Sequence, residues 1–132
     1  SDRALPNPGG GSIIVVLATD APLLPIQCQR LARRATTGLA WVGGIGGNSS
    51  GDIFLAFSTG NKVPMKTKMA DLKMLGMDEC SPLFQAAAEA TEEAIWNAMI
   101  AADIMTGFQG RTVNAIPHDL LQRAVARYAR RD

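Results

Sequence analysis

Residues 9–17, GGGSIIVVL, place a serine between three glycines and a run of apolar, mostly β-branched side chains. Such a run is typical of a strand buried on both faces, so we expect a strand over residues 13–18. In one interpretation, a glycine-rich linker simply ends at Ser12, where the strand begins. In the other, the backbone is cut between Gly11 and Ser12, which leaves the serine at a new N-terminus with a free amine beside its hydroxyl.

Two further patterns predict the elements that follow. Pro25 is tolerated in a first helical turn, and apolar residues at helical spacing continue to about Trp41, which predicts one helix. Residues 53–58, IFLAFS, again suit a strand buried on both faces. Residues 60–80 have no clear period, and we expect them to be irregular.

The C-terminal part of the chain is expected to be helical. Ser81 and Pro82 suit the N-cap and first turn of a long helix that runs to about Thr106, with Gly107 as its stop. A last helix is expected to open at Pro117.

Composition limits the class of protein. A chain of 132 residues with 47% hydrophobic and 19% charged side chains suits one soluble globular domain, which at this size needs no disulfide or structural metal. The net charge of +1 argues against nucleic acid or an anionic membrane surface as a partner. Cys28 and Cys80 are expected to be ordinary buried or half-buried thiols, and no metal or organic cofactor is expected.

The sequence also bears on where the protein acts. No apolar run approaches the roughly 20 residues that a membrane span requires. No basic-then-apolar secretory leader opens the sequence, which favours a cytoplasmic location; a periplasmic one stays open if a longer precursor carries a leader.

Two strands buried on both faces are too few to form a sheet by themselves. They demand neighbouring strands and covering layers that the rest of the sequence does not obviously supply. We therefore expect the sheet to be completed by another polypeptide or by an N-terminal portion of the same precursor.

Familiar catalytic motifs do not fit this sequence. His118, the one histidine, stands at a helix start and is expected to cap it or face solvent, which weakens any Ser/His/Asp arrangement within the chain. Residues 43–51, GGIGGNSSG, lack the Gly-Lys-Ser/Thr ending of a phosphate loop and precede a strand instead of following one. Glu92 and Glu93 are expected to lie on a solvated helix face or to contact a partner chain.

A serine at a chain N-terminus carries its own base. The reference pKa of an α-amine is about 7.7–8.0, so a useful fraction is unprotonated near neutral pH. Glycine before the scissile bond allows a strained backbone, so the Ser12 hydroxyl could attack the Gly11 carbonyl, shift the acyl group to an ester and lose it to water.

Three blocks carry a specific resemblance to a known family. They are SIIVVLATDAPLLPIQCQRLARRATTGLA, NSSGDIFLAFSTGN and ATEEAIWNAMIAA, which begin at residues 12, 48 and 90. They resemble the C-terminal subunit of the DmpA-type aminopeptidases, which comprise the L-aminopeptidase/D-amino-acid esterase-amidases and their β-aminopeptidase relatives. The resemblance covers nearly everything from Ser12 onward.

The resemblance implies an architecture. The family has an α+β fold, an αββα sandwich also found in ornithine acetyltransferases, and a precursor that cuts itself into a large and a small subunit. Residues 1–11 would then be a flexible leader or the end of the large subunit, and residues 12–132 the small-subunit part of one αββα domain. Relatives commonly assemble several αβ units.

The resemblance also implies site residues. Ser12 falls on the nucleophile, and Ser50 and Asp52 in NSSGD fall on the family's second serine and nearby acid. Ser50 would hydrogen-bond the Ser12 amine or hydroxyl, and Asp52 would orient Ser50. Some relatives carry Glu in place of Asp52, and the glutamate side chain is longer by one methylene group. Taken without the resemblance, Ser50 and Asp52 would form a turn that caps the strand entrance.

Three functions remain open from the sequence. The first is a self-processing aminopeptidase or amidase that acts on amino-acid amides, esters or short peptides of α- or β-amino acids, with the oxyanion and ammonium sites on the large subunit. The second is an acyltransferase or specialised amidase on the same fold; for an ornithine acetyltransferase a threonine nucleophile is expected, so Ser12 counts against it. The third is a non-catalytic subunit or binding module that is never cut, because eleven residues precede Ser12 in this sequence.

Overall fold

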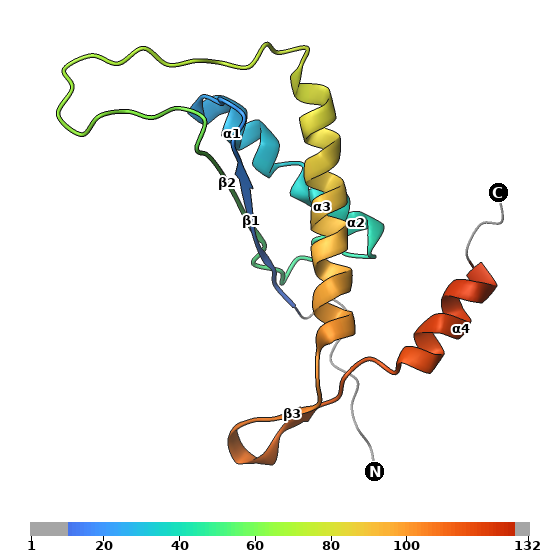
Figure 1. Cartoon of the computed structure of the whole chain (residues 1–132). Helices are drawn as coiled ribbons and strands as arrows, with labels where there is room; N and C mark the ends of the chain where they lie inside the picture. Colours follow the sequence, from blue (N-terminus) through green and yellow to red (C-terminus); the bar gives the residue numbers. More distant parts are fainter. Residues whose placement is uncertain (1–10, 129–132) are drawn as a thin grey trace. The chain divides into compact units, whose positions relative to one another are not determined.

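Two parallel strands run side by side in the computed structural model, which describes residues 11–128. β1 (Ile14–Thr19) pairs with β2 (Ile53–Ser58) along its whole length, with Ile14 opposite Ile53 and Thr19 opposite Ser58 (Figure 1). Both strands lie within one residue of the ranges expected from the sequence. The chain divides into two units at residues 92 and 93, and each is described by itself.

A pair of short helices links the two strands, where the sequence predicted one. α1 (Pro25–Ala32) and α2 (Ala35–Trp41) are separated by a tight turn, in which the N–H of Arg34 donates to the Leu31 carbonyl at 2.8 Å. The turn keeps the apolar spacing nearly intact, so the periodicity could not reveal it.

Close packing of α2 on α3 (Cys80–Ala101) gives the turn a physical reason. A Cβ placed on Gly38 of α2 would lie 2.2 Å from the Ala88 carbonyl oxygen and 2.8 Å from Cβ of Thr91, both in α3. A glycine is therefore required where the two helices meet, and the turn at residues 33–34 separates the direction of α2 from that of α1.

The strands pack against these helices on one face only. Leu17 of β1 and Ala56 of β2 contact a core that contains Leu23, Leu31 and Ala87. Side chains on the other face are 46–70% exposed, namely Ile14, Val16, Ile53, Leu55 and Phe57. Residues 11–128 alone therefore do not provide the expected burial on both faces, and an apolar sheet face stays open.

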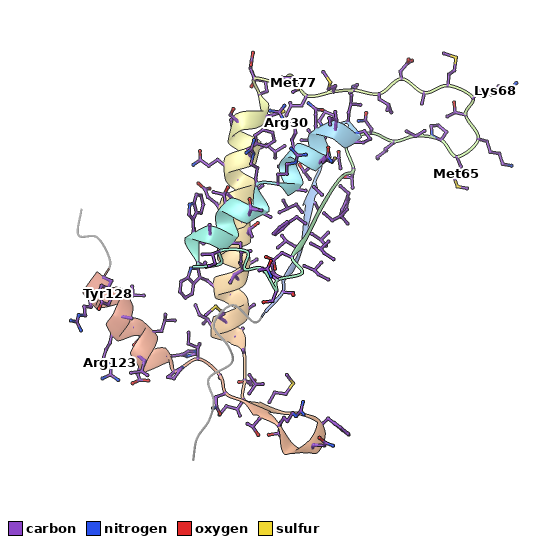
Figure 2. The ribbon with its side chains drawn as sticks, turned by 180° about the vertical axis from the view of Figure 1, so that it is seen from behind. Arg30, Met65, Lys68, Met77, Arg123 and Tyr128 are labelled. Carbon is purple, nitrogen blue, oxygen red and sulfur yellow. The ribbon has the colours of Figure 1, made fainter. Side chains whose placement is uncertain are left out.

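A long irregular segment follows β2, as the sequence predicted. Its base is fastened by Asn61, whose side chain exchanges two hydrogen bonds with the backbone of Lys73, at 2.8 and 2.9 Å. Gln27, buried in α1, donates to the Leu75 carbonyl at 2.7 Å. Figure 2 shows Met65 and Lys68 at the outer end of this segment. The segment is therefore held near its two ends.

Both cysteines are free thiols, as the sequence predicted. Cys28 in α1 is half-buried, and Cys80, the first residue of α3, is buried.

The second unit differs from the sequence prediction in one respect. α3 ends at Ala101 and not near Thr106, because Thr106 belongs to a small antiparallel hairpin of β3 (Met105–Thr106) and β4 (Thr112–Val113). Between them lies a 3-10 turn (Phe108–Gly110), with positive φ at Gln109 (56°) and Gly110 (71°).

Local bonds explain the hairpin. The N–H of Gly107 donates to the Arg111 carbonyl at 2.8 Å, so this glycine closes a hairpin and does not stop a helix. The side-chain hydroxyls of Thr106 and Thr112 lie 2.9 Å apart across the strands.

The last helix begins where the sequence predicted. α4 (His118–Tyr128) follows Pro117, whose carbonyl accepts hydrogen bonds from the N–H groups of Leu120 and Leu121. No helix within residues 11–128 combines the length and apolar character needed to cross a membrane.

Candidate active site

The parallel register brings the sequence-predicted site residues to one edge of the sheet. Ser12 lies just before β1, and Ser50 and Asp52 lie just before β2. Because Ile14 stands opposite Ile53, the segments that lead into the two strands run alongside each other, and the Ile53 N–H donates to the Ile13 carbonyl at 2.9 Å. Residues separated by 39 positions in the chain thus become neighbours.

Asp52 holds the two strand entrances together. Its Oδ1 accepts a hydrogen bond from the backbone N–H of Ile13 at 3.0 Å and lies 2.5 Å from the Ser50 hydroxyl oxygen. The Ser50 N–H also donates to the Gly47 carbonyl at 2.8 Å, which closes a turn. The carboxylate therefore both caps the strand entrance and orients a serine.

The Ser50 hydroxyl lies between two acceptors. Its oxygen is 2.5 Å from Asp52 Oδ1 and 3.0 Å from the carbonyl oxygen of Gly11. A hydroxyl carries one proton, so at any moment Ser50 donates to one of these oxygens. The second lies on the peptide group that joins Gly11 to Ser12. Ser50 can therefore turn its O–H from the carboxylate to that carbonyl oxygen.

Ser12 receives a hydrogen bond from a residue that the sequence did not single out. The backbone N–H of Gly51 donates to the Ser12 hydroxyl oxygen at 2.9 Å. A Cβ on Gly51 would lie 3.4 Å from that oxygen, the lower limit of ordinary contact. The glycine between Ser50 and Asp52 in NSSGD was the available signal. Because the Ser12 oxygen accepts this bond, its own proton stays available to a base.

A cavity of about 550 Å³ opens beside these groups. Ser12, Ser50 and Asp52 line it together with the glycine-rich loop, residues 43–47, and the apolar side chains of Leu39 and Ile45. Gly43 (φ 93°) and Gly46 (φ 61°) take left-handed conformations that side chains rarely adopt. The loop joins α2 to β2, so it forms a cavity wall from backbone, with little side-chain bulk.

Other candidates from the sequence lie elsewhere. His118 is exposed, with Nε2 3.0 Å from the Ile100 carbonyl oxygen. Glu92 is half-buried and Glu93 exposed on α3. Among residues 11–128, His, Cys, Asp and Glu side chains form no group of three that could hold a metal.

Comparison with known sequences places these residues in a family. Residues 2–113 match the sequence profile of peptidase family S58. The chain belongs to peptidase family S58. The S58 chain is 46% identical over 125 residues to the beta-peptidyl aminopeptidase BapA of Sphingosinicella microcystinivorans, which covers 93% of the chain and 32% of the relative.

Solved structures agree with the family assignment. The L-aminopeptidase D-Ala-esterase/amidase of Ochrobactrum anthropi superposes with a TM-score of 0.83 at 47% identity, over 90% of this chain and 34% of that one. That enzyme is described as a prototype for the serine aminopeptidases, with a new variant of the Ntn hydrolase fold. A Burkholderia sp. beta-aminopeptidase gives a TM-score of 0.81 at 48% identity, over 92% and 36%.

These likenesses confirm two predictions. The resemblance to the DmpA-type aminopeptidases holds, and the S58 chain has the α+β fold of those structures over the part that superposes. The S58 chain spans about a third of the length of the relatives that it matches.

Proposed function

We propose that this S58 chain is the small-subunit part of a self-processing N-terminal serine aminopeptidase or amidase. One observation carries the proposal: the Ser12 hydroxyl, the Gly11 carbonyl and the Ser50–Asp52 pair meet at one edge of the sheet. Capping a strand entrance requires Asp52 alone, whereas the contact of Ser50 with the Gly11 carbonyl is what cleavage of the Gly11–Ser12 bond requires.

The processing step uses these groups in order. The Ser12 oxygen, oriented by the Gly51 N–H, attacks the Gly11 carbonyl carbon, while Ser50 donates to the carbonyl oxygen as it gains negative charge. The C–N bond breaks, the Ser12 nitrogen takes up the proton that the hydroxyl lost, and Gly11 is left as an ester on Ser12. Asp52 holds Ser50 in position for this donation. Water then releases the Gly11 carboxylate.

Substrate hydrolysis repeats the attack on another molecule. The amine freed on Ser12, with a reference pKa of about 7.7–8.0, takes the hydroxyl proton as Ser12 attacks the first acyl group of an amide, ester or short peptide. It returns the proton to the leaving group, and water releases the acyl group from Ser12. None of these steps needs a metal or an organic cofactor.

The rest of the precursor completes the enzyme in this proposal. A large subunit covers the open sheet face and supplies the groups that bind the oxyanion and the substrate's ammonium. Several αβ units assemble, and the protein acts in the cytoplasm. The names of the relatives, a beta-peptidyl aminopeptidase and an L-aminopeptidase D-Ala-esterase/amidase, support substrates with a free amino group on α- or β-amino acids.

Mass spectrometry of the full-length precursor tests the proposal. The parent should separate into two chains with a new N-terminus at Ser12, whereas Ser12→Ala should stay intact and hydrolyse no amide. Thr67→Ala, at an exposed hydroxyl of the irregular segment, is the matched control and should behave as the parent. A stable, uncut precursor with full amidase activity would exclude the N-terminal serine mechanism.

A further inference from the structure

Two arginines lie over one aromatic ring on the helical side of the first unit. The guanidinium carbon of Arg34 is 4.5 Å from the centroid of the Phe84 ring, and that of Arg30 is 5.2 Å from it. Arg30 also donates to the Met77 sulfur at 3.6 Å, and Figure 2 shows these two residues beside the start of α3. The ring attracts both cations, but it neutralises neither.

Arg34 is short of an acceptor. Its Nε is buried and has no hydrogen-bond partner among the residues that the structure describes. Within residues 11–128 the one ion pair joins Asp119 to Arg123, so neither Arg30 nor Arg34 is paired with a carboxylate there. The Nε–H has lost water without gaining an acceptor, and the half-buried guanidinium keeps its charge, so an anion within reach of its other nitrogens would be stabilising.

A cavity beside Arg34 has the chemistry of a carboxylate site. Its volume is about 350 Å³, and its walls include Arg34, Thr37, Trp41, Ser81, Phe84 and Gln85. The hydroxyls of Thr37 and Ser81 can donate hydrogen bonds, and the two aromatic rings keep the walls apolar. The closest acid along α3, Glu89, accepts a hydrogen bond from Gln85 and does not line the cavity.

We infer that this cavity is a carboxylate-binding site, filled by an acidic side chain of the polypeptide that completes the fold. The occupant follows from two observations. The cavity offers positive charge and hydroxyl donors, so a carboxylate complements it. About two thirds of the length of the relatives lies outside this chain, which is polypeptide enough to supply the carboxylate. The identity of the occupant as the large subunit rests on the proposed function.

The processed full-length protein provides the test. Dissociation of its two chains is measured by sedimentation at increasing NaCl concentration, for the parent, Arg34→Gln, Arg34→Lys and the matched control Arg33→Gln at the exposed neighbour. Arg34→Gln should raise the dissociation constant roughly 10- to 100-fold and flatten its salt dependence, because a desolvated charge pair is lost. Arg34→Lys should have a dissociation constant between those of the parent and Arg34→Gln, because lysine keeps the positive charge but lacks the planar guanidinium group. Arg33→Gln should change the constant less than twofold.

Other outcomes overturn the inference. An unchanged dissociation constant in Arg34→Gln excludes an interchain contact, and a weaker complex with the parent's salt dependence shows that Arg34 acts through packing on Phe84. If acetate raises the thermal stability of the parent but not of Arg34→Gln, with the dissociation constant unchanged, the site takes a free carboxylate. If only the association of αβ units changes, the occupant is a second copy.

The same samples separate this inference from the proposed function. Cleavage at Gly11–Ser12 and amide hydrolysis are recorded for every variant. If the parent is never cut, the proposed function fails. The carboxylate site is then tested on the intact precursor, by the salt dependence of its urea unfolding midpoint. Arg34→Gln should lower that midpoint most, Arg34→Lys less and Arg33→Gln least. If cleavage and hydrolysis proceed while Arg34→Gln matches the parent in its dissociation constant and in the salt dependence of that constant, the carboxylate site alone is wrong.

Discussion

The two ends of β2 each carry a serine, and the two hydroxyls have different surroundings. Ser58, at the C-terminal end, donates to the Ala21 carbonyl at 2.5 Å and accepts from the N–H groups of Leu23 and Gly60. These partners are all backbone groups, which join the end of β2 to the turn after β1. Ser58 therefore has a structural role, because it stabilises the contact between the end of β2 and the turn after β1.

Ser50, near the N-terminal end, has one ionisable partner and one carbonyl. Its oxygen contacts the Asp52 carboxylate and the Gly11 carbonyl oxygen, which belongs to the peptide bond that the proposed mechanism cuts. The Ser58 hydroxyl donates to one backbone carbonyl, whereas the Ser50 hydroxyl can donate either to a carboxylate or to a carbonyl. The surroundings, not the residue type, distinguish a structural hydroxyl from one that can take part in catalysis.

Alanine at each serine tests this contrast most directly. Ser50→Ala should slow cleavage of the precursor by about 10²–10³, because the hydrogen-bond donor to the Gly11 carbonyl oxygen is lost. Ser58→Ala should leave the cleavage rate unchanged and lower the free energy of unfolding by about 1–3 kcal/mol, because backbone groups lose their partner. Timed mass spectrometry and urea unfolding measure the two effects. Equal cleavage rates in the two variants would remove the distinction.

A pH series should separate the two ends again. In the processed protein the Ser12 amine acts as base, so kcat/KM should fall as pH drops through the amine pKa, about tenfold per unit below roughly 7.7–8.0. Between pH 8 and pH 6 the loss should be about 30- to 50-fold, because part of the amine is already protonated at pH 8. The hydrogen-bond partners of Ser58 within residues 11–128 are backbone groups that do not titrate, so Ser58→Ala should have the same pH profile as the parent. A profile that is flat over this range would exclude the amine as base.

Asp52→Asn should separate the two roles of Asp52. Asparagine keeps an oxygen that can accept from the Ile13 N–H, so the strand entrance should persist, but the negative charge that draws the Ser50 proton is gone. Cleavage should slow by about 10- to 100-fold with a change in unfolding free energy below about 1 kcal/mol. A variant that unfolds readily yet cleaves normally would assign Asp52 to the cap alone.

Gly51→Ala should have the smallest effect. The added Cβ would lie 3.4 Å from the Ser12 oxygen and should shift it by a few tenths of an ångström, which should slow cleavage about three- to tenfold. The control is Gly60→Ala at the other end of β2, where a Cβ would lie 2.5 Å from the Asp20 carbonyl. That variant should be destabilised by about 1–3 kcal/mol and keep the processing rate of its folded fraction. Slower processing in Gly60→Ala, with unchanged processing in Gly51→Ala, would contradict a catalytic role for the N-terminal end of β2 and a structural role for its C-terminal end.

Much of the local structure could be predicted from residue patterns. β1 and β2 lie within one residue of their expected ranges because continuous apolar runs are a local property. The turn between α1 and α2 was missed because it depends on the fit of Gly38 against α3. The β3–β4 hairpin was also missed: Gly107 suits a helix stop, and the bonds from Gly107 and Thr106 to residues across the hairpin are invisible in a helical pattern.

The sequence by itself determined that a serine follows a triglycine and opens a strand, and that a second serine and an acid precede another strand. These are matters of residue type and order. Only the tertiary structure decided that the Ser50 hydroxyl reaches the Gly11 carbonyl and that the Gly51 N–H reaches the Ser12 oxygen. The reason is that a parallel register is set by backbone hydrogen bonds and packing between distant segments, and these bring together groups that lie 39 residues apart.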